Sequence, residues 1–179
     1  MKYQIVIAGF GGQGTVFLVK LLSLCSAAKN LNCLGTETHG MSQRGGTVVS
    51  FLKIGDVYSP LVGENQADLL LGLHPNEVLR FVQYLKKSGK LVSNGDNSFP
   101  EIDWPNMVVD GNKKSFDEKF PIQGLNVFMV GVVLGWVKEF PFSKKEIEQA
   151  IKEINPKAAK ENLRILDLGY QSSKEKAGK

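Results

Sequence analysis

A glycine-rich turn near the amino terminus constrains the fold of this chain more than any other feature. Residues 3–8 are apolar and rich in β formers, and they lead directly into Gly9-Phe10-Gly11-Gly12-Gln13-Gly14. Apolar residues then recur at helical spacing over residues 15–29. After a turn, residues 33–38 return to a strand pattern. The chain therefore opens with a Rossmann-like βαβ unit.

The glycine turn admits three interpretations. Gly9-x-Gly11-x-x-Gly14, with Glu37 at the end of the second strand, has the spacing of a dinucleotide site, in which amides at a helix start meet a phosphate. The extra glycine and the glutamine of Gly11-Gly12-Gln13-Gly14 depart from that fingerprint. In a second interpretation the glycines serve only a tight strand-to-helix turn. In the third, an anionic or amide-bearing group of another ligand docks at the turn.

A second polar segment, Glu37-Thr38-His39-Gly40-Met41-Ser42-Gln43-Arg44-Gly45-Gly46, follows the second predicted strand. Open α/β sheets bind ligands outside the carboxyl ends of their strands, so we expect this segment and the glycine turn to form one site. The donor fork of Arg44 suits a phosphate or carboxylate, on a ligand or on a partner chain, and a surface salt bridge is the alternative. His39 suits either ligand binding or a hydrogen-bonded loop position.

The candidate cofactor-binding residues come from both segments. They are Gly9, Gly11, Gly12, Gln13, Gly14, Thr15, Glu37, His39, Gln43, Arg44, Gly45 and Gly46. His74 also follows a predicted strand end, but a helix-capping role is equally consistent with its place before Pro75. No catalytic residue is assigned, because the serines are scattered and no G-x-S-x-G elbow is present.

The middle of the chain departs from plain βα alternation and then returns to it. Residues 47–54 are β formers, and Gly55-Asp56 separates them from residues 57–61, which predicts a β-hairpin inserted after the second strand. Strands at 67–73, 90–93 and 107–110 then accompany helices at 75–87 and 123–138. The pattern predicts a three-layer α/β fold with a mostly parallel sheet and helices on both faces.

Two further helices are expected at the carboxyl end. Ser143 followed by Glu146 is a capping-box pattern, and it starts a helix over residues 144–154. The last helix begins after Pro156, and we expect it to stop near Gly169, with residues 171–179 frayed. A chain of 179 residues has the length of a single domain, 1–179.

Composition excludes several classes of protein. Charged residues make up 22% and apolar residues 42%, as in globular proteins, and the longest apolar run is too short to span a bilayer. The two cysteines, Cys25 and Cys33, are expected to be reduced and buried, and two cysteines cannot by themselves hold an iron-sulfur cluster or a structural zinc ion. Arginine is scarce and the lysines are scattered, which argues against a nucleic-acid partner. We expect a cytoplasmic protein without a membrane partner.

At its two polar segments the chain resembles the gamma-type domain of the 2-oxoacid:ferredoxin oxidoreductases. The likeness rests on the glycine turn followed by Glu37-x-His39-Gly40-Met41-Ser42-Gln43-Arg44-Gly45-Gly46, and it extends over nearly the whole chain. The His-Gly-Met-x-Gln lead before the arginine is similar to the beta subunit of indolepyruvate ferredoxin oxidoreductases. Pyruvate and 2-oxoglutarate members usually carry a different second motif, and they remain the alternatives.

The resemblance implies a complex that decarboxylates an arylpyruvate, sends electrons through iron-sulfur clusters to ferredoxin, and passes the acyl group to coenzyme A. It implies that thiamine diphosphate and the 4Fe-4S clusters belong to a large partner subunit. This chain would complete the active site and help to bind coenzyme A, and it should be inactive alone. A nucleotide- or dinucleotide-binding regulatory module, supported by the same glycine turn and Glu37, is the alternative from another class.

Overall fold

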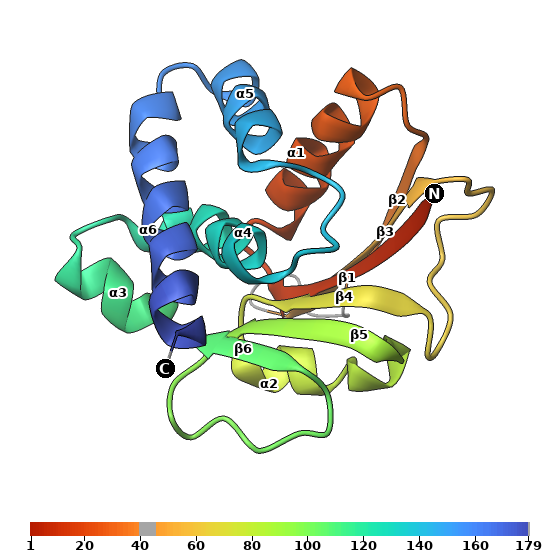
Figure 1. Ribbon diagram of the computed structural model, residues 1–179, viewed down its shortest axis with the longest axis horizontal. Coiled ribbons are helices and arrows are strands. Elements are labelled where there is room, and N and C mark those ends of the chain that lie inside the picture. The colour runs from red at the N-terminus through yellow and green to blue at the C-terminus, as the bar shows by residue number, and fades with distance from the viewer. Residues whose placement is uncertain (40–45, 179) are drawn as a thin grey trace.

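The computed structural model describes residues 1–39 and 46–178, and the strands of this part form a six-stranded sheet. The strands are β1 (Lys2–Phe10), β2 (Cys33–His39), β3 (Thr47–Gly55), β4 (Ala67–Gly72), β5 (Leu85–Asn94) and β6 (Asn106–Val109). Their order across the sheet is β2-β3-β1-β4-β5-β6 (Figure 1). β1, β4, β5 and β6 run parallel, and β3 runs antiparallel between β1 and β2. The prediction of a mostly parallel sheet is confirmed.

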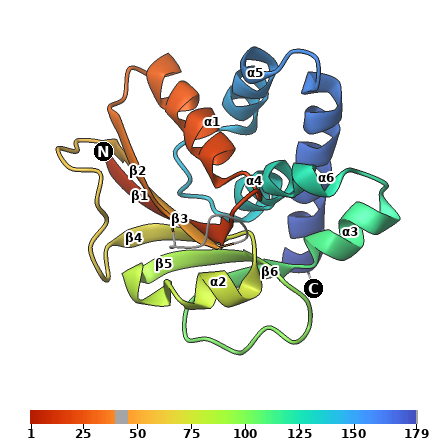
Figure 2. The same cartoon turned by 180° about the vertical axis from the view of Figure 1, so that it is seen from behind.

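Helices cover both faces of this sheet. They are α1 (Thr15–Ala28), α2 (Pro75–Leu79), α3 (Gly111–Asp117), α4 (Leu125–Trp136), α5 (Lys144–Ile154) and α6 (Ala159–Ala177), with the short 3-10 helices η1 (Val82–Tyr84) and η2 (Ile122–Gly124). α1, α4, α5 and α6 lie over one face, and α2 lies under the other (Figures 1 and 2). The predicted three-layer α/β architecture is confirmed.

The alternation of side chains along the strands divides the apolar core into two parts. Ile5 and Ile7 of β1 belong to a large cluster that includes Phe128 of α4. Val6, which lies between them in the chain, belongs to a smaller cluster with Val78 of α2. Successive side chains of a strand point to opposite faces, so a central strand covered by helices on both faces needs an unbroken apolar run. The sequence of β1 meets this requirement.

The hairpin is built from other strands than those predicted. β2 and β3 form it, with Cys33 opposite Ile54 at its open end and His39 opposite Val48 at the end where the chain connects the two strands. Residues 57–61, expected as the second hairpin strand, are not in a strand. β3 already has β2 on one side and β1 on the other, so neither of its edges is left for a further ladder. Val57 and Val62 are buried and anchor this segment instead.

The helix predicted over residues 75–87 is too long. α2 covers only its first part, and Leu85 already pairs with Ala67 of β4 as the first residue of β5. Leu85 is completely buried, so the pairing of β5 with β4 outweighs the helical spacing of apolar residues there. The short helix α3 was not expected. Asp110 caps it by accepting a hydrogen bond from the Lys113 N–H at 2.8 Å.

The predicted capping box at the start of α5 is confirmed. The Ser143 hydroxyl accepts a hydrogen bond from the Glu146 N–H at 3.4 Å, and the Glu146 carboxylate accepts one from the Ser143 N–H at 2.6 Å. These bonds satisfy N–H groups that a helix start otherwise leaves without partners. The bond from the Ser143 N–H lowers the pKa of Glu146, and the Ser143 hydroxyl and the Lys29 ammonium lower it further.

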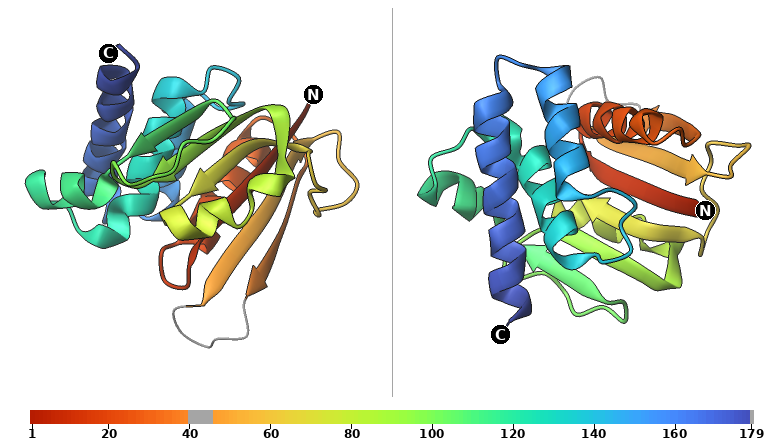
Figure 3. Two further views of the ribbon diagram at one scale, coloured as in Figure 1. Left: turned by 90° about the horizontal axis from the view of Figure 1, so that it is seen from below. Right: turned by 45° about the horizontal axis from the view of Figure 1, so that its top comes forward.

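The last helix is longer and more buried than expected. α6 runs through Gly169 to Ala177, so the expected stop at Gly169 and the expected frayed tail from residue 171 are both wrong. Ser173 is completely buried, and α6 lies alongside α4 (Figure 3). A Cβ at Gly169 would lie 1.9 Å from the Phe128 carbonyl oxygen. This glycine therefore serves close helix packing and does not end the helix.

Candidate functional site

The glycine turn joins β1 to α1 at the carboxyl end of β1. Gly12 (φ 93°) and Gly14 (φ 85°) adopt left-handed backbone conformations, which other residues rarely adopt. The Gln13 N–H donates to the Phe10 carbonyl oxygen at 3.1 Å and closes the turn. No described side chain caps α1, its first turn holds no acidic residue, and Thr15 is buried. The helix start therefore keeps N–H groups without intrahelical acceptors, an arrangement that suits an anion.

The side chain of Gln13 is engaged inside the protein. Its Oε1 accepts a hydrogen bond from the Phe10 N–H at 2.7 Å, and its Nε2 donates to the Leu73 carbonyl oxygen at 3.4 Å. A Cβ at Gly9 would lie 2.8 Å from the same Oε1. At Gly12, by contrast, no described atom lies within 4 Å of a Cβ placed there. Gln13 thus positions the turn, and Gly12 is the residue that a ligand can approach.

Asn126 in the first turn of α4 belongs to this turn, and sequence reasoning missed it. Its Nδ2 donates to the Gly14 carbonyl oxygen at 3.4 Å, and its Oδ1 accepts from the Val127 N–H at 2.7 Å. A Cβ at Gly14 would lie 2.1 Å from that Nδ2. No local pattern signals this contact, because the two residues are 112 positions apart.

The described ends of the second polar segment lie beside the glycine turn. The Gly11 N–H donates to the Gly46 carbonyl oxygen at 2.9 Å. Across the sheet, Gly9 of β1 lies opposite Val48 of β3, and Val48 lies opposite His39 of β2. The fold therefore places Gly46 beside the glycine turn. His39 lies at the same end of the sheet, but β3 separates its strand from β1.

The remaining candidates of the second segment divide into two groups. Glu37 is half-buried on β2, where it lies opposite Ser50 of β3. Gln43, Arg44 and Gly45 lie outside the described residues. A role in ligand binding for these residues, as for the glycines of the turn, stays a prediction from the sequence.

The glycine turn lies where the strand order of the sheet reverses direction. From β1 the chain goes on to β2 and β3 on one side of the sheet, and afterwards to β4, β5 and β6 on the other. The connection from β1 enters α1 over one face, and that from β4 enters α2 under the other face (Figure 1). Ligands of open α/β sheets bind outside the carboxyl ends of the strands at such a switch point. The neighbouring ends of β1 and β4 are therefore the candidate functional site.

His74 follows β4 at this switch point. Its ring lies against that of Phe10 in the glycine turn, with 4.5 Å between the ring centroids. His74 occupies the N-cap position of α2, but its side chain makes no capping hydrogen bond to a described residue. Its Nδ1 is shielded from solvent and has no hydrogen-bond partner among the described residues. Helix capping therefore does not account for this side chain.

A buried asparagine links the carboxyl ends of β4, β5 and β6. Asn94 Nδ2 donates to the Leu73 carbonyl oxygen at 3.2 Å, and Asn94 Oδ1 accepts from the Gly111 N–H at 2.9 Å. The Leu73 carbonyl oxygen is thus shared by Asn94 and Gln13. The Leu73 N–H in turn donates to the Ala8 carbonyl oxygen of β1 at 2.8 Å. This network holds the backbone beside the glycine turn in place.

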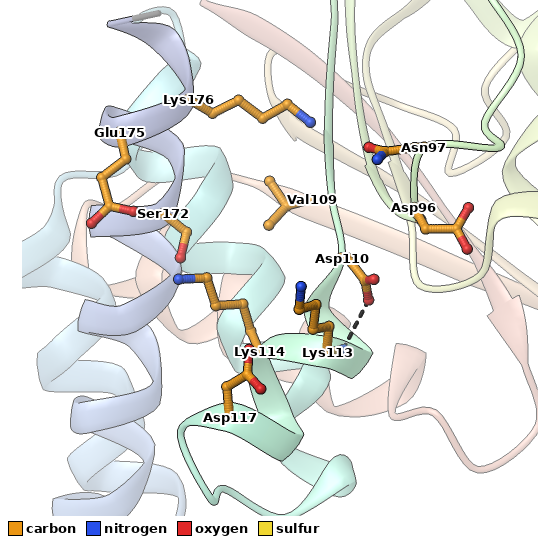
Figure 4. A pocket seen from close by; sticks show the side chains of 11 residues that line it. Asp96, Asn97, Val109, Asp110, Lys113, Lys114, Asp117, Ser172, Glu175 and Lys176 are labelled. Atoms are coloured by element: carbon orange, nitrogen blue, oxygen red, sulfur yellow. Dashed lines mark hydrogen bonds between the residues drawn. The ribbon is translucent and has the colours of Figure 1, made fainter.

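A pocket of about 590 Å³ opens farther along the same edge of the sheet, at the ends of β5 and β6. Its charged lining residues are Lys113, Lys114, Lys176, Asp96, Asp110, Asp117 and Glu175 (Figure 4). Hydrogen bonds from the hydroxyl and N–H of Ser98 lower the pKa of Asp96. Four carboxylates thus face three ammonium groups, so this pocket does not concentrate positive charge as the site of a polyanion would.

The described residues contain no group of three or more His, Cys, Asp or Glu side chains that could hold a metal ion. Cys25 and Cys33 are free thiols; Cys25 is buried as expected, and Cys33 is only half-buried. Burial raises the pKa of the Cys25 thiol to about 12, and the Glu146 carboxylate adds to the effect. No helix in the described part of the chain is long and apolar enough to cross a bilayer.

A doubly wound α/β sheet with an uncapped helix start at its switch point is the architecture in which many α/β proteins hold an anionic ligand at a glycine turn. The family model of pyruvate ferredoxin/flavodoxin oxidoreductase matches residues 4–172, and the chain belongs to this family. Indolepyruvate oxidoreductase subunit IorB of Thermococcus kodakarensis is 34% identical over 199 residues, which cover 99% of this chain and 98% of that protein.

Two solved structures share the fold. The gamma subunit of a keto/oxoacid ferredoxin oxidoreductase from Geobacter sulfurreducens matches with a TM-score of 0.79 at 19% identity, over 96% of this chain and 98% of that one. A 2-oxoglutarate:ferredoxin oxidoreductase from Magnetococcus marinus, with 2-oxoglutarate, coenzyme A and succinyl-CoA bound, matches with a TM-score of 0.79 at 15% identity, over 97% of this chain and 31% of that one. Together with this fold, the family match and the relationship to the Thermococcus subunit identify the chain as a small subunit of a 2-oxoacid:ferredoxin oxidoreductase.

Proposed function

We propose that this chain helps to bind coenzyme A in an arylpyruvate:ferredoxin oxidoreductase, with indolepyruvate as the substrate. The observation that carries the proposal is the uncapped start of α1 at the switch point between β1 and β4. Coenzyme A carries several phosphates, and the N–H groups of a helix start suit a phosphate. Among the described residues, no atom would lie within 4 Å of a Cβ at Gly12, which leaves room for such a group next to the turn.

The proposed division of labour follows from the cysteines. A 4Fe-4S cluster takes about four thiolate ligands, whereas this chain has two cysteines, of which Cys25 is buried. A large partner subunit is therefore proposed to carry the clusters and thiamine diphosphate, which supply electron transfer towards ferredoxin and the decarboxylation chemistry. The residues of this chain bind and orient coenzyme A and complete the wall of the active site.

Arg44→Ala in the assembled complex tests the anion-binding part of the proposal. A charge-assisted hydrogen bond contributes about 1.5–3 kcal/mol, so we expect the KM for coenzyme A to rise about tenfold or more. Arg44→Lys keeps the charge but loses the planar fork, so its KM for coenzyme A should lie between the values of the wild type and of Arg44→Ala. If KM and kcat are both unchanged in Arg44→Ala, Arg44 does not belong to the site.

The substrate assignment is tested by co-purifying the chain with its native partner. The complex is then assayed for ferredoxin reduction with indolepyruvate, pyruvate and 2-oxoglutarate. The name of the Thermococcus relative supports indolepyruvate, and we expect the highest kcat/KM for it. A higher kcat/KM for pyruvate or 2-oxoglutarate would make that 2-oxoacid the assigned substrate and would leave the family assignment unchanged.

The rival interpretation, a nucleotide-binding regulatory module, predicts a different ligand for the same turn. Thermal unfolding of the complex is measured with coenzyme A and with NAD, since a ligand that binds only the folded state raises its stability. We expect stabilisation by coenzyme A alone. Stabilisation by NAD alone would favour the regulatory module.

A further inference from the structure

We propose that His74 is a further ligand-binding residue, whose Nε2–H donates a hydrogen bond to a phosphate or carbonyl oxygen of the ligand held at the glycine turn. The inference rests on the proposed coenzyme A site and deepens it. It adds a side-chain donor from β4 to the backbone donors of the β1–α1 turn. The two strands are the pair that flanks the switch point.

Two contacts place His74 beside the turn. Its ring lies against Phe10, with 4.5 Å between the centroids and 57° between the ring planes. The residue before it, Leu73, donates its N–H to the Ala8 carbonyl oxygen of β1 at 2.8 Å. Phe10 is itself part of the glycine turn, so a ligand that lies on the turn has the imidazole as a direct neighbour.

The backbone that carries His74 is held from both sides. The Leu73 carbonyl oxygen accepts hydrogen bonds from Gln13 Nε2 at 3.4 Å and from Asn94 Nδ2 at 3.2 Å. Asn94 is itself buried and bound to the Gly111 N–H at 2.9 Å. A donor on a backbone fixed in this way loses little freedom when it binds a ligand.

The surroundings of the ring decide which nitrogen can serve as the donor. Nδ1 is shielded from solvent and has no partner among the described residues. A proton on Nδ1 would bury an N–H without an acceptor, which is the less favourable of the two neutral arrangements. The neutral ring therefore carries its proton on Nε2, the nitrogen that remains for a ligand.

The other polar side chains of the turn are not available to a ligand, which leaves His74 as the donor. Gln13 uses both ends of its amide on backbone groups, and Thr15 is buried. His74 is half-buried, and Nε2 is not among the side-chain atoms that are both shielded from solvent and without a partner. Within the described residues, its side chain makes no capping hydrogen bond to α2, so helix capping does not explain why a histidine stands here.

Binding without turnover tests the proposal in the purified complex of this chain with its large subunit. Calorimetry in the absence of 2-oxoacid measures the Kd of coenzyme A for the wild type and for His74→Ala, His74→Gln and Gln83→Ala. We expect His74→Ala to raise Kd about tenfold, as loss of one hydrogen bond to an anion or carbonyl does. His74→Gln keeps an N–H at the corresponding position and should recover most of the affinity. Gln83, exposed on η1 away from the turn, is the control and should change nothing.

Fragments of coenzyme A distinguish the two possible acceptors of the His74 hydrogen bond, a phosphate oxygen and an amide carbonyl oxygen. Adenosine 3′,5′-bisphosphate carries phosphates without amides, and pantetheine carries amides without phosphates. If His74→Ala weakens only the bisphosphate, the acceptor is a phosphate oxygen. If it weakens only pantetheine, the acceptor is an amide carbonyl. If it weakens neither fragment nor coenzyme A itself, the proposal is overturned.

A measurement on the wild-type complex removes any dependence on how the variants fold. Exchange of the imidazole C2–H, read by mass spectrometry, should slow at His74 when coenzyme A binds. The chain has only two histidines, His39 and His74, so their two peptides are read separately. Binding of coenzyme A with unchanged exchange at His74 would sink the inference and leave the proposed function standing. Failure of the complex to bind coenzyme A at all would overturn both.

Discussion

Gly12 and Gly14 stand two residues apart in one turn, yet they are glycines for different reasons. Both have a positive φ, which strains any residue with a Cβ. Around Gly12 the described part of the chain leaves open space, whereas Gly14 faces the buried amide of Asn126. A Cβ at Gly12 would thus meet no described atom, whereas the absence of a Cβ at Gly14 allows α4 to approach α1.

This difference predicts unequal losses of stability. Gly12→Ala should lower the free energy of unfolding by about 1–2 kcal/mol, the strain of a left-handed residue. Gly14→Ala should lower it by about 2–4 kcal/mol, because the Cβ also displaces Asn126 from its hydrogen bonds. Urea unfolding of the two variants checks the order. Equal losses would mean that Asn126 can move away without cost and that its contact with Gly14 does not contribute to stability.

At the scale of elements, the capping box of α5 makes the stability of the fold depend on pH. Because the folded-state pKa of Glu146 is lowered from 4.5, its carboxylate stabilises the fold fully above that value. The contribution is lost as the pH falls below 4.5 and through the lowered pKa. The ion pair with Lys29, 3.2 Å long, also ties α5 to the end of α1.

Glu146→Ala should therefore destabilise the protein in a pH-dependent way. We expect a loss of about 1 kcal/mol at neutral pH, the usual contribution of a helix cap. Urea unfolding repeated at about pH 3 should show a smaller difference between wild type and variant. Glu148→Ala, which removes a half-buried i,i+4 pair with Lys144, is the matched control. A difference that is the same at both pH values contradicts the assigned role of the carboxylate.

Glycines allow α4 and α6 to pack closely against each other. A Cβ at Gly131 would lie 2.2 Å from the Leu166 carbonyl oxygen, and one at Gly169 would lie 1.9 Å from that of Phe128. These neighbours are backbone atoms, so no rotation of a side chain relieves the overlap. Gly178, by contrast, has only an ordinary contact at 3.5 Å.

Gly169→Ala should therefore separate the two helices. We expect a loss of about 3 kcal/mol or more in the free energy of unfolding, in the upper range of overpacked cores. Gly178→Ala should change it by less than about 0.5 kcal/mol. Thermal unfolding followed by circular dichroism measures both. If Gly169→Ala is as stable as Gly178→Ala, α6 can shift along α4 without a loss of stability, and the close packing does not require glycine.

At the scale of the whole molecule, the proposed function makes the chain one side of a site that it shares with a partner subunit. The purified chain should not oxidise any 2-oxoacid, because its two cysteines cannot hold a cluster. Ferredoxin reduction should begin when the large subunit is added and reach a maximum at a fixed ratio of the two. Oxidation of an arylpyruvate by this chain without a partner would overturn the proposed division of cofactors.

Much of the candidate site could be located from the sequence because its signals are local. The glycine turn, the following helix and the box of Ser143 and Glu146 each depend on residues a few positions apart. The second polar segment was placed near the turn by a rule about strand ends, and the bond from Gly11 to Gly46 agrees with it. The ligand role of these residues remains to be measured.

Other parts of the site have no local signal. Asn94 and Asn126 are single asparagines without a surrounding motif, and the partners that connect them to the site lie 17 to 112 positions away. The internal engagement of Gln13 depends on the Leu73 carbonyl oxygen, which the fold brings from β4. His74 drew notice as a strand-end residue, but its contact with Phe10 exists only after β1 and β4 pair.

The sequence by itself determined the opening strand, turn and helix and the start of α5, because short-range backbone preferences and capping decide such elements. Only the tertiary structure decided that β3 pairs with β2 and β1, that Leu85 leaves the helix for β5, and that α6 passes through Gly169. Strand pairing and helix packing join residues far apart in the chain, and the free energy of burying both partners outweighs the local preference of either.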